Sequence, residues 1–257
     1  MRDFFTEAFV DRDYRAASAS LLPDFIQHSP EVGAGVSGFL EGVGAYIDPR
    51  PDLVTTIHRV FSEGDLVFIH AEQADAPGAA ATASMDIFRV ADGKIAEHWD
   101  AQQEVPATTA NGHTMFDGPT VPAAIPAADG EVNRAAALDF LDLAFNHAKA
   151  QEAVDTYVGA TYVQHNPNVA DGGAAFVDAF AGATPLTGDK KTVFPRSIVD
   201  GDVVVQTFAP TGDGMAGSGS IDIFRFDADN KIVEHWDAVQ DYPTKTASGN
   251  TVWDDGR

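Results

Sequence analysis

Two copies of one short motif carry the residues best suited to acid–base chemistry. The pentapeptide EHWDA at 97–101 reappears at 234–238, displaced by 137 positions. In a β-strand, His98 and Asp100 share one face and Trp99 lies on the other. If the first face lines a cleft, burial raises the pKa of the carboxyl group and suits it to proton transfer beside the imidazole.

The opposite orientation of this strand has a purely structural meaning. If Trp99 alone belongs to the core, His98 and Asp100 lie in solvent, and the same choice applies to His235 and Asp237 in the second copy. Alternation favours the two orientations equally, so the acid–base interpretation is a hypothesis at this point.

A second pair of histidines, His28 and His165, lies in segments of the pattern Gln-His-x-Pro. The proline biases the residue before it toward extended backbone, so each histidine is expected to project from a short, fixed segment. There it either hydrogen-bonds a substrate carbonyl or orients the aspartate, or it caps a neighbouring turn through a ring nitrogen. Both interpretations remain open.

Two further acids, Asp86 and Asp222, lie inside predicted strands, where an unpaired carboxylate is disfavoured. Arg59 and Arg196, from another strand of each copy, are candidate partners. Cross-strand pairing at the surface explains these four residues most simply, which makes them weaker pocket candidates.

A metal site is conceivable, since each copy offers two histidines and two carboxylates. However, the chain has no cysteine and no His-Glu-x-x-His helix, and hydrogen bonding explains the spacing of His98 and Asp100 equally well. We expect no metal and no cofactor.

The elements that must position these residues also occur twice. DIFR at 86–89 matches 222–225, and ANGHTMFD at 110–117 matches ASGNTVWD at 247–254, so the repeat spans nearly the whole of each half. Between the halves, the Pro- and Ala-rich stretch 119–131 predicts a linker. We therefore expect domains at 1–118 and 132–257.

Each copy begins with helical spacing of apolar residues and continues with a period of two. Helices are predicted at 3–17, 36–47, 133–148 and 174–183. Strands are predicted at 53–61, 65–74, 81–90 and 94–103, and again at 192–199, 203–210, 220–227 and 231–240. This order predicts an α+β unit in which helices cover one face of a curved antiparallel sheet above a cleft. The two units are expected to pack as a pseudo-dimer, with further homo-oligomers left open.

Charge excludes several classes of partner. The 257 residues include 39 acidic and 16 basic ones, for a net charge of −23, which repels nucleic acids and anionic membranes. Residues 1–128 carry 19 acids and 7 bases, and the remainder carries 20 and 9, so the charge belongs to both copies. It suggests an adaptation to high salt. Because residues 1–15 contain no uninterrupted apolar segment, we expect a cytoplasmic protein.

The order of the motifs Q-H-x-P, G-D-x-V, D-I-F-R and E-H-W-D-A resembles the SnoaL-like polyketide cyclase family of the NTF2-like superfamily, in both halves. The resemblance implies a cone-shaped α+β barrel with a deep pocket. It also implies that Asp100 and Asp237 act as acid/base in an aldol closure without metal or cofactor. The orienting shell that it implies consists of His98, His235, His28 and His165.

The implied function is cyclase, isomerase or hydratase chemistry on a small carbonyl compound. Two other classes stay open, because one fold hosts many functions. The first is a small-molecule-binding module without catalysis. The second is an epoxide-hydrolase-like enzyme in which paired acids activate water, for which Asp86 and Arg59 are the candidates to join Asp100.

The two copies are not expected to have identical pockets. His70 aligns with Thr207 and Gln102 with Val239 at the displacement of the repeat, which leaves open that one copy is degenerate.

Overall fold

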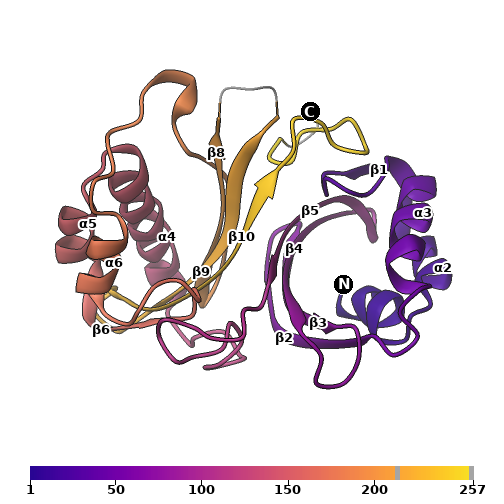
Figure 1. Cartoon of the computed structure of the whole chain (residues 1–257), viewed down its shortest axis with the longest axis horizontal. Helices are drawn as coiled ribbons and strands as arrows, with labels where there is room; N and C mark the ends of the chain where they lie inside the picture. The colour runs from indigo at the N-terminus through magenta and orange to yellow at the C-terminus, as the bar shows by residue number, and fades with distance from the viewer. Residues whose placement is uncertain (212–214, 255–257) are drawn as a thin grey trace.

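Alternating apolar residues form four antiparallel strands in each half, as the sequence predicts, and a fifth strand joins them (Figure 1). The structure is a computed structural model that describes residues 1–211 and 215–254. The first half contains α1 (Arg2–Phe5), η1 (Thr6–Val10), α2 (Tyr14–Ala17), η2 (Ser18–Ser20), β1 (Leu21–Gln27), α3 (Gly35–Ile47), β2 (Val54–Glu63), β3 (Leu66–Ala74), β4 (Ala81–Ala91) and β5 (Lys94–Glu104). The second contains α4 (Ala127–Leu141), η3 (Asp142–Asn146), α5 (Ala150–Tyr157), β6 (Val158–Gln164), α6 (Gly173–Ala179), η4 (Gly188–Lys190), β7 (Val193–Asp200), β8 (Asp202–Pro210), β9 (Gly217–Phe226) and β10 (Ile232–Tyr242).

The strand that sequence periodicity missed is β1, together with β6 in the second half. β1 pairs in parallel with β5, so the sheet order is β1-β5-β4-β3-β2, and the second sheet repeats it as β6-β10-β9-β8-β7. Pro23 and a register shift between Leu21 and Ile26 interrupt the alternation of β1 and remove its period-two signal. The sheets are therefore mixed, and β1 leads the Gln-His-x-Pro segment to the side of β5.

The opening helix of each half differs in its bounds from the prediction. The segment 3–17 is interrupted between η1 and α2, where Arg12 adopts a positive φ of 63°. In the second half the helical segment ends at Asn146, shortly before Ala148 with a positive φ of 54°. α4 already begins at Ala127, so the stretch predicted as a linker, 119–131, ends in a helix. Pro126 directly precedes this helix as its N-cap, a place where the missing N–H of proline costs nothing.

Helices and the concave face of each sheet enclose an apolar core. Phe4 packs on Phe88 with ring centroids 5.9 Å apart, and Phe140 on Phe224 at the same distance, both edge to face. The sheets do not close strand to strand, since β1 and β2 are edges, and the helices cover the open side of the expected barrel. Within the described residues, no helix combines the length and apolar character needed to cross a membrane.

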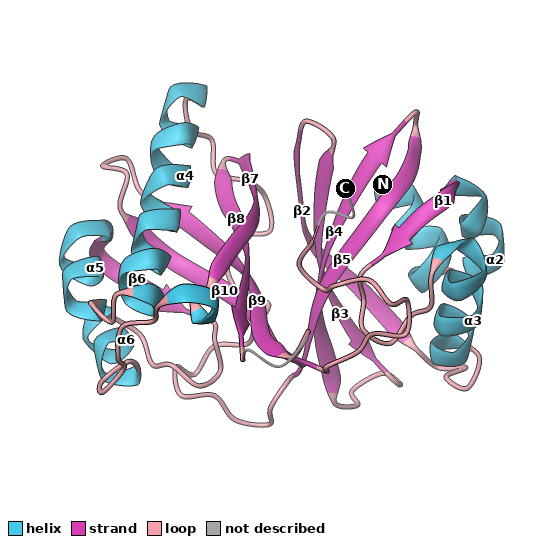
Figure 2. Ribbon diagram, turned by 90° about the horizontal axis from the view of Figure 1, so that it is seen from above, coloured by secondary structure: helices cyan, strands magenta, loops and turns pink. Residues whose placement is uncertain are grey.

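The convex faces of the two sheets pack against each other, with helices on the two outer sides (Figure 2). One shared core fills this interface. It contains Phe61, Phe68, Met85, Ile87, Trp99 and Ala101 from the first half and Ile198, Val204, Ile221, Ile223, Trp236 and Ala238 from the second. The two copies thus form a pseudo-dimer inside one chain, in agreement with the sequence-based expectation.

The segment that follows the last strand of each copy crosses to the other copy. Ala110 N donates to Pro167 O and Ala247 N donates to Pro30 O, each at 2.8 Å. These contacts explain the repeated eight-residue segments 110–117 and 247–254, because each one docks on the Gln-His-x-Pro segment of the opposite half. We refer to them below as the exchanged tails.

Candidate functional site

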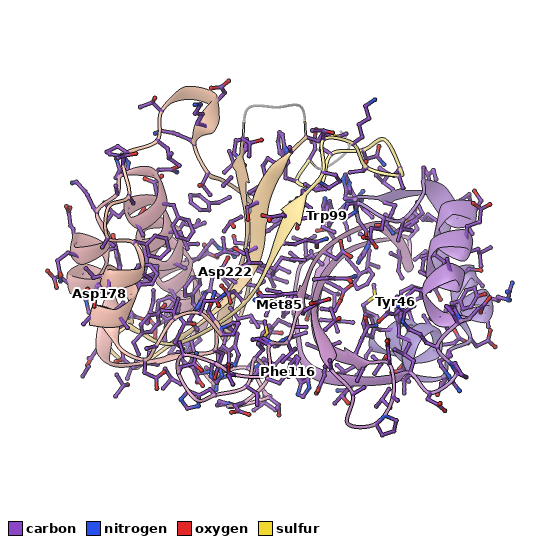
Figure 3. The ribbon with its side chains drawn as sticks, in the orientation of Figure 1. Tyr46, Met85, Trp99, Phe116, Asp178 and Asp222 are labelled. Carbon is purple, nitrogen blue, oxygen red and sulfur yellow. The ribbon has the colours of Figure 1, made fainter. Side chains whose placement is uncertain are left out.

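Each half contains a cavity between its helices and the concave face of its sheet. The cavity volume is about 330 Å³ in the first half and about 290 Å³ in the second. Figure 3 shows Tyr46 inside the curve of the first sheet, whereas Trp99 and Met85 lie between the two sheets. The polar residues that recur at equivalent places in both cavities are Gln27 and Gln164, Ser84 and Ser220, Asp86 and Asp222, His98 and His235, and Asp100 and Asp237.

The orientation of β5 and β10, open in the sequence, is determined by the second sheet. His98, Asp100 and Gln102 line the first cavity, while Glu97 and Trp99 face the interface between the halves. Both faces of the strand are buried, so a tryptophan in one core does not exclude a functional face on the other side.

The imidazole of His98 is held at both ring nitrogens. Nδ1 lies 2.8 Å from Gln27 Oε1, and Nε2 lies 3.0 Å from Asp86 Oδ1. Gln27 Oε1 also accepts from Ser29 N at 2.9 Å, which identifies it as the carbonyl oxygen and makes His98 Nδ1 a donor. Asp86 presents a carboxyl oxygen to Nε2, and two atoms that both carry lone pairs need a proton between them, so a second proton lies between Nε2 and Asp86.

The second half repeats this arrangement. His235 lies 2.8 Å from Gln164 Oε1 and 3.0 Å from Asp222 Oδ1, and Asn166 N donates to Gln164 Oε1 at 2.9 Å. Burial by itself would lower the pKa of both cavity histidines. The hydrogen bond to the adjacent aspartate and the nearby carboxylate charges outweigh it, so the pKa of His98 and that of His235 are raised.

Asp100 and Asp237 each present one free oxygen. The two residues are 4% and 5% exposed, and Oδ1 of each is buried without a hydrogen-bond partner. Oδ2 of Asp100 accepts from Gln102 Nε2 at 3.1 Å, and Oδ2 of Asp237 accepts from Asn166 Nδ2 at 2.7 Å. A buried carboxylate oxygen without a hydrogen-bond donor costs free energy of folding. The free oxygen of each aspartate is therefore available to take a proton from a bound ligand.

Burial is the main cause of the altered acidity of these two aspartates. It raises the pKa of Asp100, with the neighbouring Asp86 adding to the effect and with His98 and the side-chain hydrogen bonds of Ser29 and Gln102 opposing it. It raises the pKa of Asp237 to about 6, where His235 and the hydrogen bond from Asn166 act in the opposite direction. Such a carboxyl group exchanges its proton near neutral pH.

His28 and His165 lie outside the cavities, at the interface between the halves. His28 stacks on Trp99 with ring centroids 5.0 Å apart, its Nε2 lies 2.8 Å from Glu97 Oε1, and its Nδ1 donates to the carbonyl of Thr251. His165 likewise stacks on Trp236 and contacts Thr114 O at 2.9 Å. Each of these histidines therefore uses a ring nitrogen to anchor an exchanged tail.

Arg59 and Arg196 also lie on the interface side and do not face Asp86 or Asp222. The Arg59 guanidinium lies 4.2 Å from the ring centre of Trp236, and that of Arg196 lies 3.6 Å from the ring centre of Trp99. Each arginine therefore packs on the tryptophan of the other copy. The set nominated for water activation, Asp100 with Asp86 and Arg59, is not assembled, because alternation along β2 directs Arg59 to the convex face of the sheet.

Sequence reasoning missed several residues of the cavities. The motif analysis singles out His28 and not Gln27, although Gln27 occupies the same place in both copies of the motif.

The alignment of His70 with Thr207 at the displacement of the repeat is also wrong. His70 pairs with Met85 across the ladder, and Gln206 pairs with Ile221 in the same way, so Gln206 is its counterpart. A one-residue loop difference shifts the repeat here.

Each cavity has a cluster of three groups capable of metal ligation. Ligand atoms of Asp86, His98 and Asp100 lie within 4.8 Å of one another, as do those of Asp222, His235 and Asp237. A metal ion at either cluster would have to displace the proton between the imidazole and the adjacent aspartate. The hydrogen-bonded arrangement already gives each of these histidine nitrogens a partner.

The matching family fits this architecture. The sequence model of the SnoaL-like domain matches residues 1–98 and again 137–235, and the chain therefore belongs to the SnoaL-like domain family, with two tandem copies. No curated protein matches the chain.

Solved structures of similar proteins each cover about one copy. IdmH from Streptomyces antibioticus, described as a putative polyketide cyclase, is 22% identical, covers 39% of this chain and 88% of its own, and gives a TM-score of 0.34. A putative polyketide cyclase from Sinorhizobium meliloti is 21% identical, with coverages of 38% and 89% and a TM-score of 0.33. A putative ketosteroid isomerase from Kribbella flavida is 18% identical, with coverages of 40% and 75% and a TM-score of 0.35.

Proposed function

We propose that the protein is a SnoaL-like enzyme that acts on a small carbonyl compound by general acid–base catalysis, with Asp100 and Asp237 as the catalytic groups. The chemistry is aldol-type cyclisation, isomerisation or hydration, and it needs no cofactor. The observation that carries the proposal is the free, buried Oδ1 of each aspartate inside a cavity, next to an imidazole that is fixed at both nitrogens.

The proposed step begins with a proton on the carbon next to a substrate carbonyl. Asp100 or Asp237 removes this proton as a carboxylate, and the electron pair of the C–H bond passes into the enolate. The imidazole and its aspartate partner together carry no net charge, but the imidazole is a fixed polar group beside the reacting carboxyl group, and such preorganised groups stabilise charge that develops in a transition state. The protonated aspartate then returns the proton to the new alkoxide or to another carbon.

The environment of the cavities supports a mainly apolar substrate. Phe4, Phe39 and Phe88 line the first cavity, and Phe140, Phe176 and Phe224 line the second. Aromatic walls with a few polar groups at one end are typical of small-molecule sites. In this proposal the partner is a small molecule and no nucleic acid, and a cytoplasmic location remains a prediction from the sequence.

Proton exchange offers a test that does not require the natural substrate. The protein is incubated in D2O with α-tetralone, a bicyclic ketone, and deuterium at the α-carbon is followed by NMR. We expect exchange with the wild type, and a loss of about 10²-fold or more in the double variant Asp100→Asn, Asp237→Asn. Asp24→Asn, at an exposed position of β1, is the matched control and should exchange at the wild-type rate.

The outcomes separate the candidate functions. A correctly folded double variant that retains exchange would overturn the role of the two aspartates. Binding of the ketone without any exchange by the wild type would instead favour a binding module that uses the same cavities.

A further inference from the structure

A second unpartnered group lies in the cavity of the second half. The hydroxyl of Tyr162 is buried without a hydrogen-bond partner, and the residue is 3% exposed. Tyr162 belongs to β6 and lines the same cavity as Asp237 and His235, with its ring centre 6.4 Å from that of His235. A buried phenol without a partner is rare in a folded protein, because an unmade hydrogen bond to such a group costs about 1–3 kcal/mol.

The neighbouring side chains leave the phenolic proton available. Gln164 lies two residues along β6, and its side-chain interaction with the phenol acts to lower the pKa of Tyr162, as a donor to the phenolic oxygen does. Its Oε1 already accepts from His235 Nδ1 and from Asn166 N. Gln164 can therefore approach the phenol only as a donor through its amide nitrogen, so the proton of Tyr162 remains free to bind an acceptor.

Tyr162 remains a phenol over the working range of the protein. Burial raises its pKa, the nearby charges of Asp237 and Asp222 raise it further, and the interaction with Gln164 opposes them without reversing the direction. The hydroxyl is thus a donor that does not ionise when the neighbouring carboxyl group titrates.

The first cavity lacks this group. Phe25 occupies the equivalent place on β1, 137 positions before Tyr162, and it lines the cavity beside Asp100. The first cavity instead has polar groups on another wall, where Tyr46 donates to Gln73 Oε1 at 3.3 Å and Gln102 replaces Val239. The two cavities share an acid–base centre and differ in what surrounds it.

We infer that Tyr162 is a catalytic residue of the second cavity, which donates a hydrogen bond to the carbonyl oxygen of an apolar ketone whose α-carbon faces Asp237. The inference rests on the proposed function. When Asp237 takes the α-proton, the electron pair of the C–H bond moves to the carbonyl oxygen, and the hydrogen bond from Tyr162 strengthens as negative charge develops there. Tyr162 keeps its own proton throughout, and Asp237 holds the proton taken from carbon.

The ligand class follows from the walls of the second cavity. Apolar side chains form much of this lining: Phe140, Phe145, Phe176, Phe180 and Val239. The hydroxyls of Thr207 and Ser220 are 2.7 Å apart, and Ser220 donates to Asp222 at 2.6 Å, so they satisfy each other. A ligand with one carbonyl and an apolar body fits this distribution, whereas further hydroxyl groups would find few partners.

The kinetic test isolates the second cavity with Asp100→Asn, which removes the aspartate of the first. In this background, Tyr162→Phe introduces the residue that the first cavity naturally has. We expect the kcat for exchange of α-tetralone to fall about 10²-fold while KM changes little. Tyr157→Phe, on the helix α5, is the matched control and should leave kcat unchanged.

A spectroscopic measurement tests the hydrogen bond without turnover. α-Tetralone labelled with 13C at its carbonyl is added to the double variant Asp100→Asn, Asp237→Asn, and its carbonyl stretch is recorded by infrared difference spectroscopy. We expect a bound band shifted to lower frequency, which disappears when Tyr162→Phe is added. The converse variant, Phe25→Tyr, should add a shifted band from the first cavity.

The outcomes for Tyr162 differ from those for the aspartates. If Asp237→Asn abolishes the remaining exchange but Tyr162→Phe leaves kcat and the carbonyl band unchanged, the role of Tyr162 is overturned and the proposed function stands. If exchange survives Asp100→Asn and Asp237→Asn together, the proposed function fails, and a shifted band would still show the donor role of Tyr162. Absence of any shifted band in the double variant also overturns the inference.

Discussion

Replacing Asp237 by asparagine should make the protein more stable at neutral and basic pH. Burial raises the pKa of this carboxyl group to about 6 from 3.8, so the folded state binds its proton more tightly than the unfolded state does. The sign is the reverse of the usual one for a paired carboxylate. Ionisation costs folding free energy above the folded pKa, and this cost disappears as the pH falls below the unfolded pKa.

The size of the effect follows from the shift. About two pKa units correspond to about 3 kcal/mol, at 1.36 kcal/mol per unit. That is a large fraction of the typical stability of a folded domain, about 5–15 kcal/mol. Asparagine has the same shape, and its carbonyl oxygen can accept the hydrogen bond that Asn166 Nδ2 now gives to Asp237 Oδ2 at 2.7 Å.

Urea unfolding of the wild type and Asp237→Asn at constant salt, from about pH 4 to about pH 8, measures the difference. We expect the variant to gain about 3 kcal/mol at the basic end and little at the acidic end. Asp24→Asn, which is exposed, should show no pH-dependent gain. A variant less stable than the wild type at about pH 8, or a gain independent of pH, would refute the reasoning.

Three further predictions concern other parts of the molecule. Arg89 lies 2.6 Å from the buried carboxylate of Glu97, so Glu97→Gln leaves this arginine with a neutral partner. Urea unfolding should show that the variant loses about 3 kcal/mol of unfolding free energy, whereas Glu104→Gln, at an exposed position, should lose none. Gln27→Leu removes the acceptor of His98 Nδ1, so NMR titration should find the pKa of this imidazole lowered from its wild-type value, and an unchanged titration would contradict the assigned network. Transfer to low salt should weaken the circular dichroism signal, because the net charge of −23 is then unscreened; indifference to salt would count against the proposed adaptation.

Most of the fold was accessible from the sequence because the duplication doubled each weak signal. The four strands of the meander and α3 appear close to their predicted ends, since turns and alternation both mark them. β1 was missed because a proline and an irregular register hide its period. Arg12 and Ala148, in the left-handed region, end helices that apolar spacing alone extends.

The site was only partly accessible, because alternation tells which residues share a face but not what covers that face. His98 and Asp100 were found together, yet their direction depended on the second sheet, which buries Trp99 from the other side. His28 and Arg59 were expected near the aspartates. Both lie at the interface, because contacts with the other copy, which no local pattern encodes, hold them there.

The sequence also could not reveal which residues lack partners. Tyr162 and Phe25 differ by one hydroxyl, and nothing in the spacing of the chain shows that this hydroxyl is left without an acceptor. This follows only from the packed neighbours, above all from the hydrogen bond of His235 to Gln164, which occupies the amide oxygen that could otherwise accept from Tyr162.

The fusion of two copies through exchanged tails has an evolutionary consequence. In a homodimer encoded by one short gene, every substitution appears in both subunits, so a change that improves one site alters the other at once. Here each half inherits its mutations separately, while the exchanged tails and the reciprocal pairs of arginine and tryptophan keep the halves together. One cavity can therefore change its ligand specificity by mutation while the other keeps the original one. Selection acts on a single polypeptide with two sites that change independently.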